Sequence, residues 1–374
     1  KVNLHAEGKR EGKGFKIQIS TVSGKVNIDF PIATEPIAPP VLFKWISEQK
    51  LKVGEKYKVS LFDPTLILRG AKPENLNANL FIEGEEQIKI PIGSFKTYRV
   101  NMQFMNSQST YWITKEGEII REVSPLGLIS LKESKEKVLG ETLKSLDIVQ
   151  KTAISSNASL DNPRSIKLLR VKIDGIEPSK GLNMGDNKQF LENGIMEIKQ
   201  IDLSTVIPYD IPYTKEFTYY TEPTNLIQSD NPKIIEESAK ILEGERNSIS
   251  AARKINNWVY KNIEKIPTVS LPNALDVLET KKGDCNEHAT LFAALSRAAG
   301  IPTKVVLGVV YVNGKFYYHA WNEVYIGNWV PTDPTFGQLP ADASHIKFVE
   351  GNLDRSSEII KIVGKIKIEI LDAT

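Results

Sequence analysis

The chain has 374 residues, of which 48 are basic and 46 acidic, so its net charge is +2. This balance gives no electrostatic basis for binding nucleic acid or an anionic membrane surface. At about 100–200 residues per domain the length predicts two or three domains. No apolar run approaches the about 18 residues of a transmembrane helix, and a single cysteine excludes an internal disulfide.

The compartment is weakly constrained by these numbers. One free cysteine is compatible with the cytoplasm and equally with a periplasmic or surface protein that uses no disulfides. The chain begins at Lys1, so the missing signal peptide carries no information. We favour a periplasmic or extracellular location over a cytoplasmic one.

The first half of the chain reads mainly as β-strands. Alternating apolar and polar residues predict strands over 15–19, 26–30, 57–62, 79–82, 87–92, 97–105, 110–114, 118–123, 166–173 and 195–203. The run Lys115-Glu116-Gly117 predicts a hairpin turn, and 134–146 reads as a short amphipathic helix. Proline- and aspartate-rich stretches at 208–212 and 223–232 predict a linker. We therefore expect a β-rich N-terminal region over residues 1–222, with one or two domains.

The remainder of the chain, 223–374, changes to helices followed by strands. Helical periodicity predicts helices over 233–245, 249–264, 274–279 and 284–299, the last ended by Gly300 and Pro302. Strands are predicted over 304–312, 316–326, 329–332 and 365–371. Helices followed by an antiparallel meander imply an α+β domain. The predicted fold class for the whole chain is therefore α+β.

Cys285 is the first candidate for chemistry. It follows Gly283-Asp284, a turn and a plausible N-cap, which would place it in the first turn of a helix. Unpaired N–H groups and the positive end of the helix dipole favour a thiolate there, which is the nucleophilic form. Taken alone, a lone cysteine is more often buried and inert.

His319 and Asp333 favour a catalytic role for Cys285 over an inert one. His319 lies in the second predicted strand after the helix that Cys285 begins, and Asp333 comes directly after the next predicted strand. A helix start and two neighbouring strands can bring three side chains together at such spacings. A thiolate, an imidazole that moves a proton and a carboxylate that fixes the imidazole tautomer are the groups that thiol acyl transfer needs.

These motifs resemble the transglutaminase-like superfamily over about residues 249–350. The matching pieces, in order, are Gly283-Asp284-Cys285, Gly300-Ile301-Pro302, His319-Ala320-Trp321 with Glu323-Val324, and Trp329 leading into Asp333-Pro334-Thr335. The run 333–338 with 341–346 is similar to a bacterial branch described as cysteine proteases. The resemblance implies a circularly permuted papain-like fold with Cys285 as nucleophile, His319 as base and Asp333 as the orienting acid.

The sequence departs from the animal crosslinking transglutaminases beside the nucleophile. Those enzymes carry Gln before and Trp after the cysteine, where this chain has Asp284 and Asn286. Trp258, on a predicted helix upstream of Cys285, has a periodicity that favours the core over a role in the transition state. Trp321 and Trp329 are expected in the core or a pocket wall. These departures weaken a crosslinking function and leave the hydrolytic groups untouched.

The other histidines and Glu323 have less specific interpretations. His288 lies one helical turn after Cys285 and is expected to be structural, with a base role as the minor alternative. His345 is expected at a helix start with a packing or hydrogen-bonding role, and His5 is expected in solvent. Glu323 shares the His319 face and is expected to support it, although contact with a substrate amine or buttressing of the site stays open. No zinc motif or phosphate loop occurs, so we expect no metal and no cofactor.

The function predicted from the sequence is attack by Cys285 on an amide or peptide carbonyl through a thioester, most simply as a cysteine protease or amidase. The alternatives are amine transfer, as in a protein-glutamine transglutaminase, and a non-catalytic adhesion or scaffold protein. A protein or peptide is the expected substrate, with cell-envelope material among the candidates. Nucleic acid is not an expected partner.

Overall fold

The computed structural model describes residues 5–12, 14–21, 24–31, 36–49, 51–63, 76–104, 107–124, 129–140, 152–175, 182, 184–186, 188–266, 273–351, 359 and 362–374. Contacts within the chain divide it into two compact units. The larger consists mainly of Val149–Thr374, and the smaller of Leu4–Ser20 and Lys25–Ile148.

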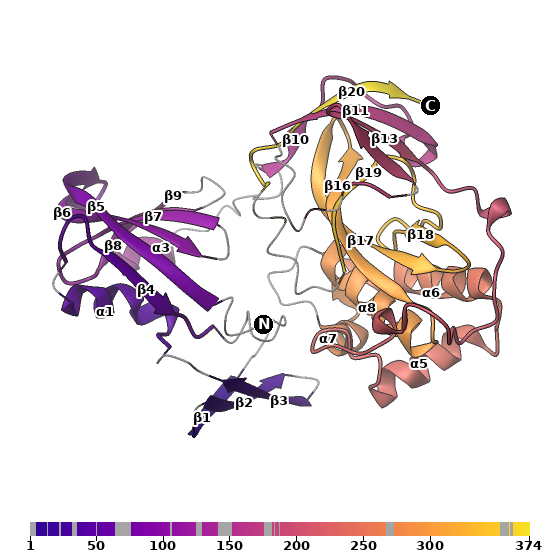
Figure 1. Cartoon of the computed structure of the whole chain (residues 1–374), viewed down its shortest axis with the longest axis horizontal. Helices are drawn as coiled ribbons and strands as arrows, with labels where there is room; N and C mark the ends of the chain where they lie inside the picture. Colours follow the sequence, from indigo (N-terminus) through magenta and orange to yellow (C-terminus); the bar gives the residue numbers. More distant parts are fainter. Residues whose placement is uncertain are drawn as a thin grey trace. The chain divides into compact units, whose positions relative to one another are not determined.

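The smaller unit contains two sheets. The first has the order β1-β2-β3, with β1 His5–Glu11, β2 Gly14–Thr21 and β3 Gly24–Pro31. The second is a six-stranded antiparallel meander of β4 Lys56–Ser60, β5 Asn77–Ile90, β6 Gly93–Phe104, β7 Ser107–Ile113, β8 Ile119–Val123 and β9 Ile129–Leu131. The helices are η1 Pro39–Val41, α1 Leu42–Glu48 and α3 Lys135–Gly140 (Figure 1).

One face of the six-stranded sheet is apolar because its strands alternate. Leu80, Ile82 and Val100 point from β5 and β6 into a core that includes Phe43 of α1. The predicted turn after β7 is present, and it requires glycine. Gly117 has φ +80°, and a Cβ there would lie 2.3 Å from the carbonyl oxygen of Phe43. The two strands expected over 79–82 and 87–92 are one long strand, β5, with an irregular register after Ile82.

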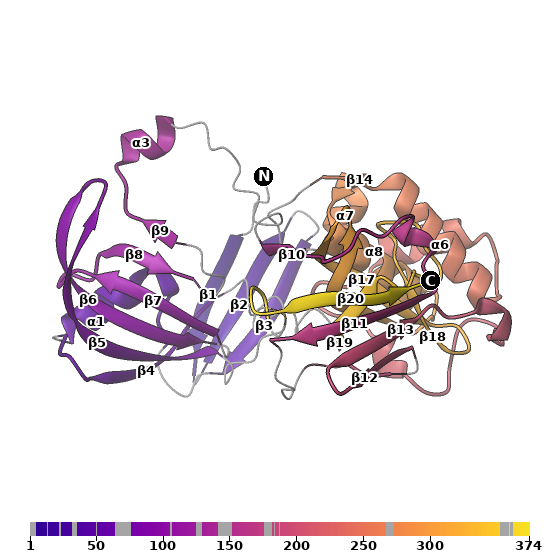
Figure 2. The same cartoon turned by 90° about the horizontal axis from the view of Figure 1, so that it is seen from above.

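The larger unit is built on two sheets. One has the order β10-β17-β16-β19 with β18 paired to β17; its strands are β10 Ile154–Ser155, β16 Thr303–Val312, β17 Lys315–Tyr325, β18 Trp329–Thr332 and β19 His345–Gly351. The other has the order β12-β13-β11-β20, formed by β11 Leu168–Asp174, β12 Gln189–Glu192, β13 Ile195–Lys199 and β20 Lys367–Ala373. Figure 2 shows β20, β11 and β13 side by side.

Helices cover one end of the long strands of the first sheet (Figure 1). They are α5 Pro232–Leu242, α6 Ser248–Asn262, α7 Ala274–Thr280 and α8 Cys285–Ala298, with short 3-10 turns at η3 Pro163–Ser165, η4 Leu203–Thr205 and η5 Thr218–Tyr220. The two-residue strands β14 Glu264–Lys265 and β15 Lys282–Gly283 pair in parallel just before α8.

Helix α8 is the centre of this arrangement. Leu291, Phe292 and Leu295 are fully buried on it, and its neighbours include α5, α6, α7 and the strands β16 and β17. The amide of Asn322 on β17 donates to the carbonyl oxygen of Ala289 on α8 at 3.0 Å. Because α8 is surrounded on both sides, its first turn is held in a fixed place relative to β17.

The predicted α+β class is confirmed, but the expected division near residue 222 differs from the structure. Strand β11 pairs with the C-terminal strand β20, and Val171 and Met196 share a core with Val309 and Phe316 of β16 and β17. The 208–232 region, expected as a linker, also packs into this unit, where Ile227 is fully buried. Strand propensity and proline-rich stretches do not reveal pairing between strands so far apart in the sequence.

Of the predicted helix over 134–146, the described part is α3; the rest lies outside the described residues. Within the described part of the chain, no helix is long and apolar enough to cross a membrane.

Candidate active site

Cys285 is the first residue of α8, and its neighbours determine where the helix begins. The Asp284 carboxylate accepts the Asn286 N–H at 2.8 Å, and Glu287 accepts the Asp284 N–H at 3.0 Å. Glycine is needed at position 283, because a Cβ there would lie 2.2 Å from the Cβ of Glu287. Cys285 is partly exposed, and a first-turn N–H has no acceptor within its own helix. The thiol therefore lies at the positive end of the helix dipole.

Two carboxyl groups flank the start of α8. Burial raises the pKa of Asp284 to about 7, and the nearby Glu287 carboxylate adds to this effect, against the opposing effect of hydrogen bonds from Asn286. The pair therefore carries less than two full negative charges near neutral pH. This limits the repulsion that it exerts on a thiolate at Cys285.

His319 on β17 lies between Asp333 and Cys285. Its Nε2 is 2.7 Å from Oδ2 of Asp333, which leaves Nδ1 for the sulfur side. Burial alone would lower the pKa of His319, but the charge and hydrogen bond of Asp333, together with those of Cys285, raise it to about 9. The ring stacks on Phe336 at a centroid distance of 5.2 Å. His319 is therefore held as an imidazolium between two partners at neutral pH.

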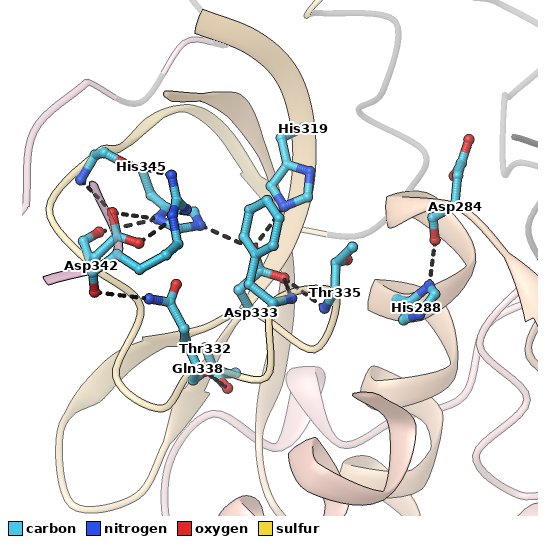
Figure 3. Close-up of polar contacts among 12 residues, drawn as sticks. Asp284, His288, His319, Thr332, Asp333, Thr335, Gln338, Asp342 and His345 are labelled. Carbon is cyan, nitrogen blue, oxygen red and sulfur yellow. Dashed lines mark hydrogen bonds and ion pairs between the residues drawn. The ribbon is translucent and has the colours of Figure 1, made fainter. Parts of the chain in front are cut away.

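Asp333 follows β18 and is fully buried. Its Oδ1 accepts the N–H groups of Thr335 at 2.7 Å and Phe336 at 3.1 Å, so the turn after β18 orients the carboxylate. Its Oδ2 accepts from His319 and, at 3.0 Å, from Nε2 of His345 (Figure 3). Burial would raise the pKa of Asp333, but the two imidazoles hold it well below its usual range. Four donors thus maintain it as an anion.

His345 is the residue that the sequence interpretation underrates. A helix start is expected there, but His345 begins the strand β19. It is nearly fully buried and shares the Asp333 carboxylate with His319, which no local pattern predicts. The only sequence signal is its position in the run Ala341-Asp342-Ala343-Ser344-His345, close after Asp333.

His288 does not take the place of His319. It is fully buried within α8, and its Nδ1 lies 2.7 Å from the carbonyl oxygen of Asp284, one turn earlier. Burial lowers the pKa of His288. Figure 3 shows it directed along its own helix. This placement agrees with the structural role expected from the sequence.

Glu323 belongs to a different cluster from the one expected. The sequence predicts that it supports His319, but its carboxylate contacts Lys188 at 2.6 Å and Lys347 at 3.0 Å. Burial would raise the pKa of Glu323, but the two lysines lower it to about 2. Strand alternation correctly placed Glu323 on the His319 face, but it could not show that lysines from distant segments reach that face.

The tryptophans differ in burial. Trp321 is fully buried, with its ring 6.1 Å from the His319 ring. Trp258, expected in the core, is only partly buried, and the Lys281 ammonium lies 4.1 Å above its ring. Trp329 is also partly buried, under Lys304 at 4.2 Å. Of the three, Trp321 is the one that contacts the imidazole.

His319, Asp333 and His345 also have the side-chain types that bind metal ions, and their candidate ligand atoms lie within 4.8 Å of one another. However, both Nε2 atoms are only 2.7 and 3.0 Å from the same Asp333 oxygen. Ligands of tetrahedral zinc, at about 2.0–2.1 Å from the ion, are about 3.3 Å apart. The spacing is therefore that of direct hydrogen bonds.

Comparison with known proteins agrees with this architecture. Residues 236–334 match the family model of the transglutaminase-like superfamily. This segment, which contains Cys285, His319 and Asp333, is a transglutaminase-like domain.

Two curated relatives are similar to part of the chain. An uncharacterized Haemophilus influenzae protein is 34% identical over 108 residues, which cover 27% of this chain and 29% of that protein. The kyphoscoliosis peptidase of Mus musculus is 35% identical over 123 residues, which cover 29% of this chain and 19% of that protein. The similarity thus spans less than a third of either relative.

Among solved structures, one from Cytophaga hutchinsonii described as a "putative cysteine protease" is similar at 20% identity and a TM-score of 0.37. The match covers 56% of this chain and 85% of that one.

Proposed function

We propose that the protein is a thiol-dependent acyl-transfer enzyme that hydrolyses an amide or peptide bond. Cys285 is the nucleophile, His319 the acid and base, and Asp333 the group that orients His319. The observation that supports this most directly is that one buried imidazole interacts with Asp333 through Nε2 and also hydrogen-bonds with Cys285. A thiol, an imidazole and a carboxylate in this order are the parts of an activated nucleophile.

In the proposed reaction, the Cys285 thiolate forms a bond to the carbonyl carbon. The resulting oxyanion accepts a hydrogen bond from the backbone N–H of Cys285, at the start of α8. The His319 imidazolium then gives its proton to the leaving nitrogen as the C–N bond breaks. Water attacks the resulting thioester and passes a proton to His319, which releases the acid and restores the thiolate. Asp333 holds Nε2–H throughout, so that Nδ1 is the nitrogen that exchanges protons.

Hydrolysis is favoured over amine transfer by the residue next to the nucleophile. Asn286 is only partly buried, and its amide donates to Asp284 at 3.3 Å. A polar side chain at this position does not shield the thioester from water. Amine transfer requires such shielding, because water is present at about 55 M.

The first test is alkylation of the only cysteine by iodoacetamide at mildly acidic pH, followed by intact mass. Rapid formation of a single adduct is expected, since the His319 imidazolium stabilises the thiolate. His319→Gln should slow the reaction by about 10²-fold, whereas the matched variant His288→Gln should not. Equal slowing by both variants, or slow alkylation of the wild type, would contradict the assignment and favour a non-catalytic scaffold.

The second test distinguishes hydrolysis from transfer. A panel of peptide and cell-envelope substrates is incubated in H₂¹⁸O with a millimolar primary amine, and products are identified by mass spectrometry. Acids carrying ¹⁸O should dominate, and Cys285→Ala should abolish turnover. Dominant amine adducts would contradict hydrolysis and indicate an amine-transfer enzyme. We also propose that the protein acts outside the cytoplasm, and cell fractionation tests this location.

A further inference from the structure

Two imidazoles share one carboxylate oxygen in the candidate site. His319 and His345 place their Nε2 atoms 2.7 and 3.0 Å from Oδ2 of Asp333. The two rings are 6.0 Å apart, and both histidines are nearly fully buried. The proposed reaction uses His319 and leaves His345 without a role.

The neighbours of His345 determine its protonation. Its Nε2 faces the Asp333 carboxylate, and its Nδ1 faces the carbonyl oxygen of Asp342 at 3.1 Å and Oδ1 of Asp342 at 3.4 Å. All of these are acceptors, so each nitrogen needs a proton to make its contact. Burial alone would lower the pKa of His345, but Asp342 and Asp333 raise it to about 9. At neutral pH, His345 is therefore a cation that donates from both nitrogens.

Asp342 is itself fixed in place. Its carboxylate accepts the Ser344 N–H at 2.8 Å and pairs with Arg164 of η3 at 3.0 Å. The Arg164 guanidinium also lies 4.6 Å from the centre of the Phe336 ring, the ring that stacks on His319. Burial would raise the pKa of Asp342, but the histidine and arginine lower it to about 2. A chain of alternating charges thus runs from Arg164 to His319.

We propose that His345 is a positioning residue, which donates from both ring nitrogens, holds Oδ2 of Asp333 towards His319 and shares its negative charge. Holding the oxygen maintains the Nε2–H tautomer that the reaction needs. Sharing the charge weakens the attraction between Asp333 and the His319 imidazolium, so the proton on Nδ1 remains transferable. This inference rests on the proposed function, because His345 acts only through Asp333 and His319.

The alternative is that His345 is an ordinary buried member of an ion pair that supports the strand β19. Lys347, two residues further on the same strand, is such a residue: it is nearly fully buried and pairs with Glu323 and Glu350. Lys347→Met is therefore the matched control for loss of a buried charge from β19. A structural role predicts the same behaviour for both positions.

Two variants separate position from charge. His345→Gln can still donate to Asp333 but is neutral, and His345→Ala does neither. The rate of Cys285 alkylation and, with a substrate in hand, kcat and KM are measured from mildly acidic to alkaline pH. For His345→Ala we expect a fall of about 10²-fold in kcat with little change in KM. For His345→Gln we expect a smaller fall, with the basic limb of the profile about one pH unit higher, because Asp333 then acts on His319 alone.

Lys347→Met should lose stability without any change in the pH profile. Full activity and a wild-type profile in folded His345→Ala, or an unshifted profile in His345→Gln, would overturn the inference. If His345→Ala does not fold by circular dichroism, His345→Gln decides. Failure of the proposed function would appear separately, as slow alkylation of the wild type.

A direct readout is independent of activity. In ¹⁵N–¹H NMR of the wild type near neutral pH, both ring nitrogens of His345 should carry protons, with assignment by His345→Gln. A single-protonated ring would exclude the proposed charge sharing. A ring protonated on one nitrogen, whose spectrum changes on addition of EDTA, would indicate a bound metal instead.

Discussion

Asp333→Asn removes the charge that the two buried imidazoles share while it keeps the size of the side chain. Burial alone would lower the pKa of both histidines, yet their acidic partners raise the pKa of His319 and of His345 to about 9 from an ordinary value of 6.5. A histidine with a raised pKa contributes stability that is fully present below about pH 6.5 and is lost as the pH rises through about 9. The pH window for this test therefore lies between these two values.

The magnitude follows from the size of the shifts. At about 1.4 kcal/mol per pH unit, each histidine contributes about 3 kcal/mol. Because the two rings titrate as one coupled set on Asp333, we expect a combined loss of about 3–5 kcal/mol across the window. In Asp333→Asn the loss should shrink to less than half, since His345 keeps only Asp342 as a counter-ion. The same substitution should lower kcat by about 10⁴-fold, as expected for loss of the group that fixes the imidazole tautomer.

Hydrogen exchange measured by mass spectrometry can measure this pH-dependent loss of stability around the site itself. Peptides from α8 and β17 report opening around the site, after correction for intrinsic exchange rates at each pH. Peptides from β5 and β6 in the smaller unit are the internal control, and a Cys285→Ala background removes titration of the thiol. If the opening free energies of α8 and β17 fall equally with pH with and without the Asp333→Asn substitution, the two imidazoles do not derive their charge from Asp333.

Three further predictions follow from packing. Gly308→Ala should destabilise the larger unit by about 1–3 kcal/mol, because the new Cβ would lie 2.0 Å from a carbonyl oxygen of β19 and 2.6 Å from Trp321; an unchanged urea midpoint would contradict this. Glu323→Gln should cost about 3–5 kcal/mol because the buried Lys188 loses its ion-pair partner, while thiol alkylation of the folded protein stays normal. A fragment 149–374 should retain fast alkylation, whereas 223–374 should fail to fold by circular dichroism, since it lacks β11 to β13.

Much of the arrangement around the site is predictable from local sequence. The capping residue and the glycine before Cys285 predict a helix start, and the structure places both as expected. The alternation over 316–326 predicts the strand that carries His319, and its 2.7 Å contact with Asp333 agrees with the expected convergence. These features depend on neighbours within a few residues, and a single sequence records such neighbours well.

Local sequence patterns do not predict which distant strands pair or which residues neutralise a buried charge. Nothing in the local pattern of His345 distinguishes a strand start beside Asp333 from the expected helix start. Lys188, a partner of Glu323, lies far earlier in the sequence, just before β12. The expected division near residue 222 differs for the same reason, because the pairing of β11 with β20 joins the two ends of the larger unit.

The charges of the proposed catalytic groups are balanced by residues outside the matched family segment. Within 236–334 the proposed groups are a thiolate at the partly exposed Cys285, the buried His319 imidazolium and the buried Asp333 carboxylate, which together carry one net negative charge. His345 and Arg164 supply two positive charges, and Asp342 supplies one negative charge, so these six groups together are neutral, with the Asp284–Glu287 pair beside Cys285 counted separately. A neutral set avoids the cost of an uncompensated buried charge. In the proposed site, the strands and turns around the family segment therefore supply counter-charges to the buried pair of His319 and Asp333.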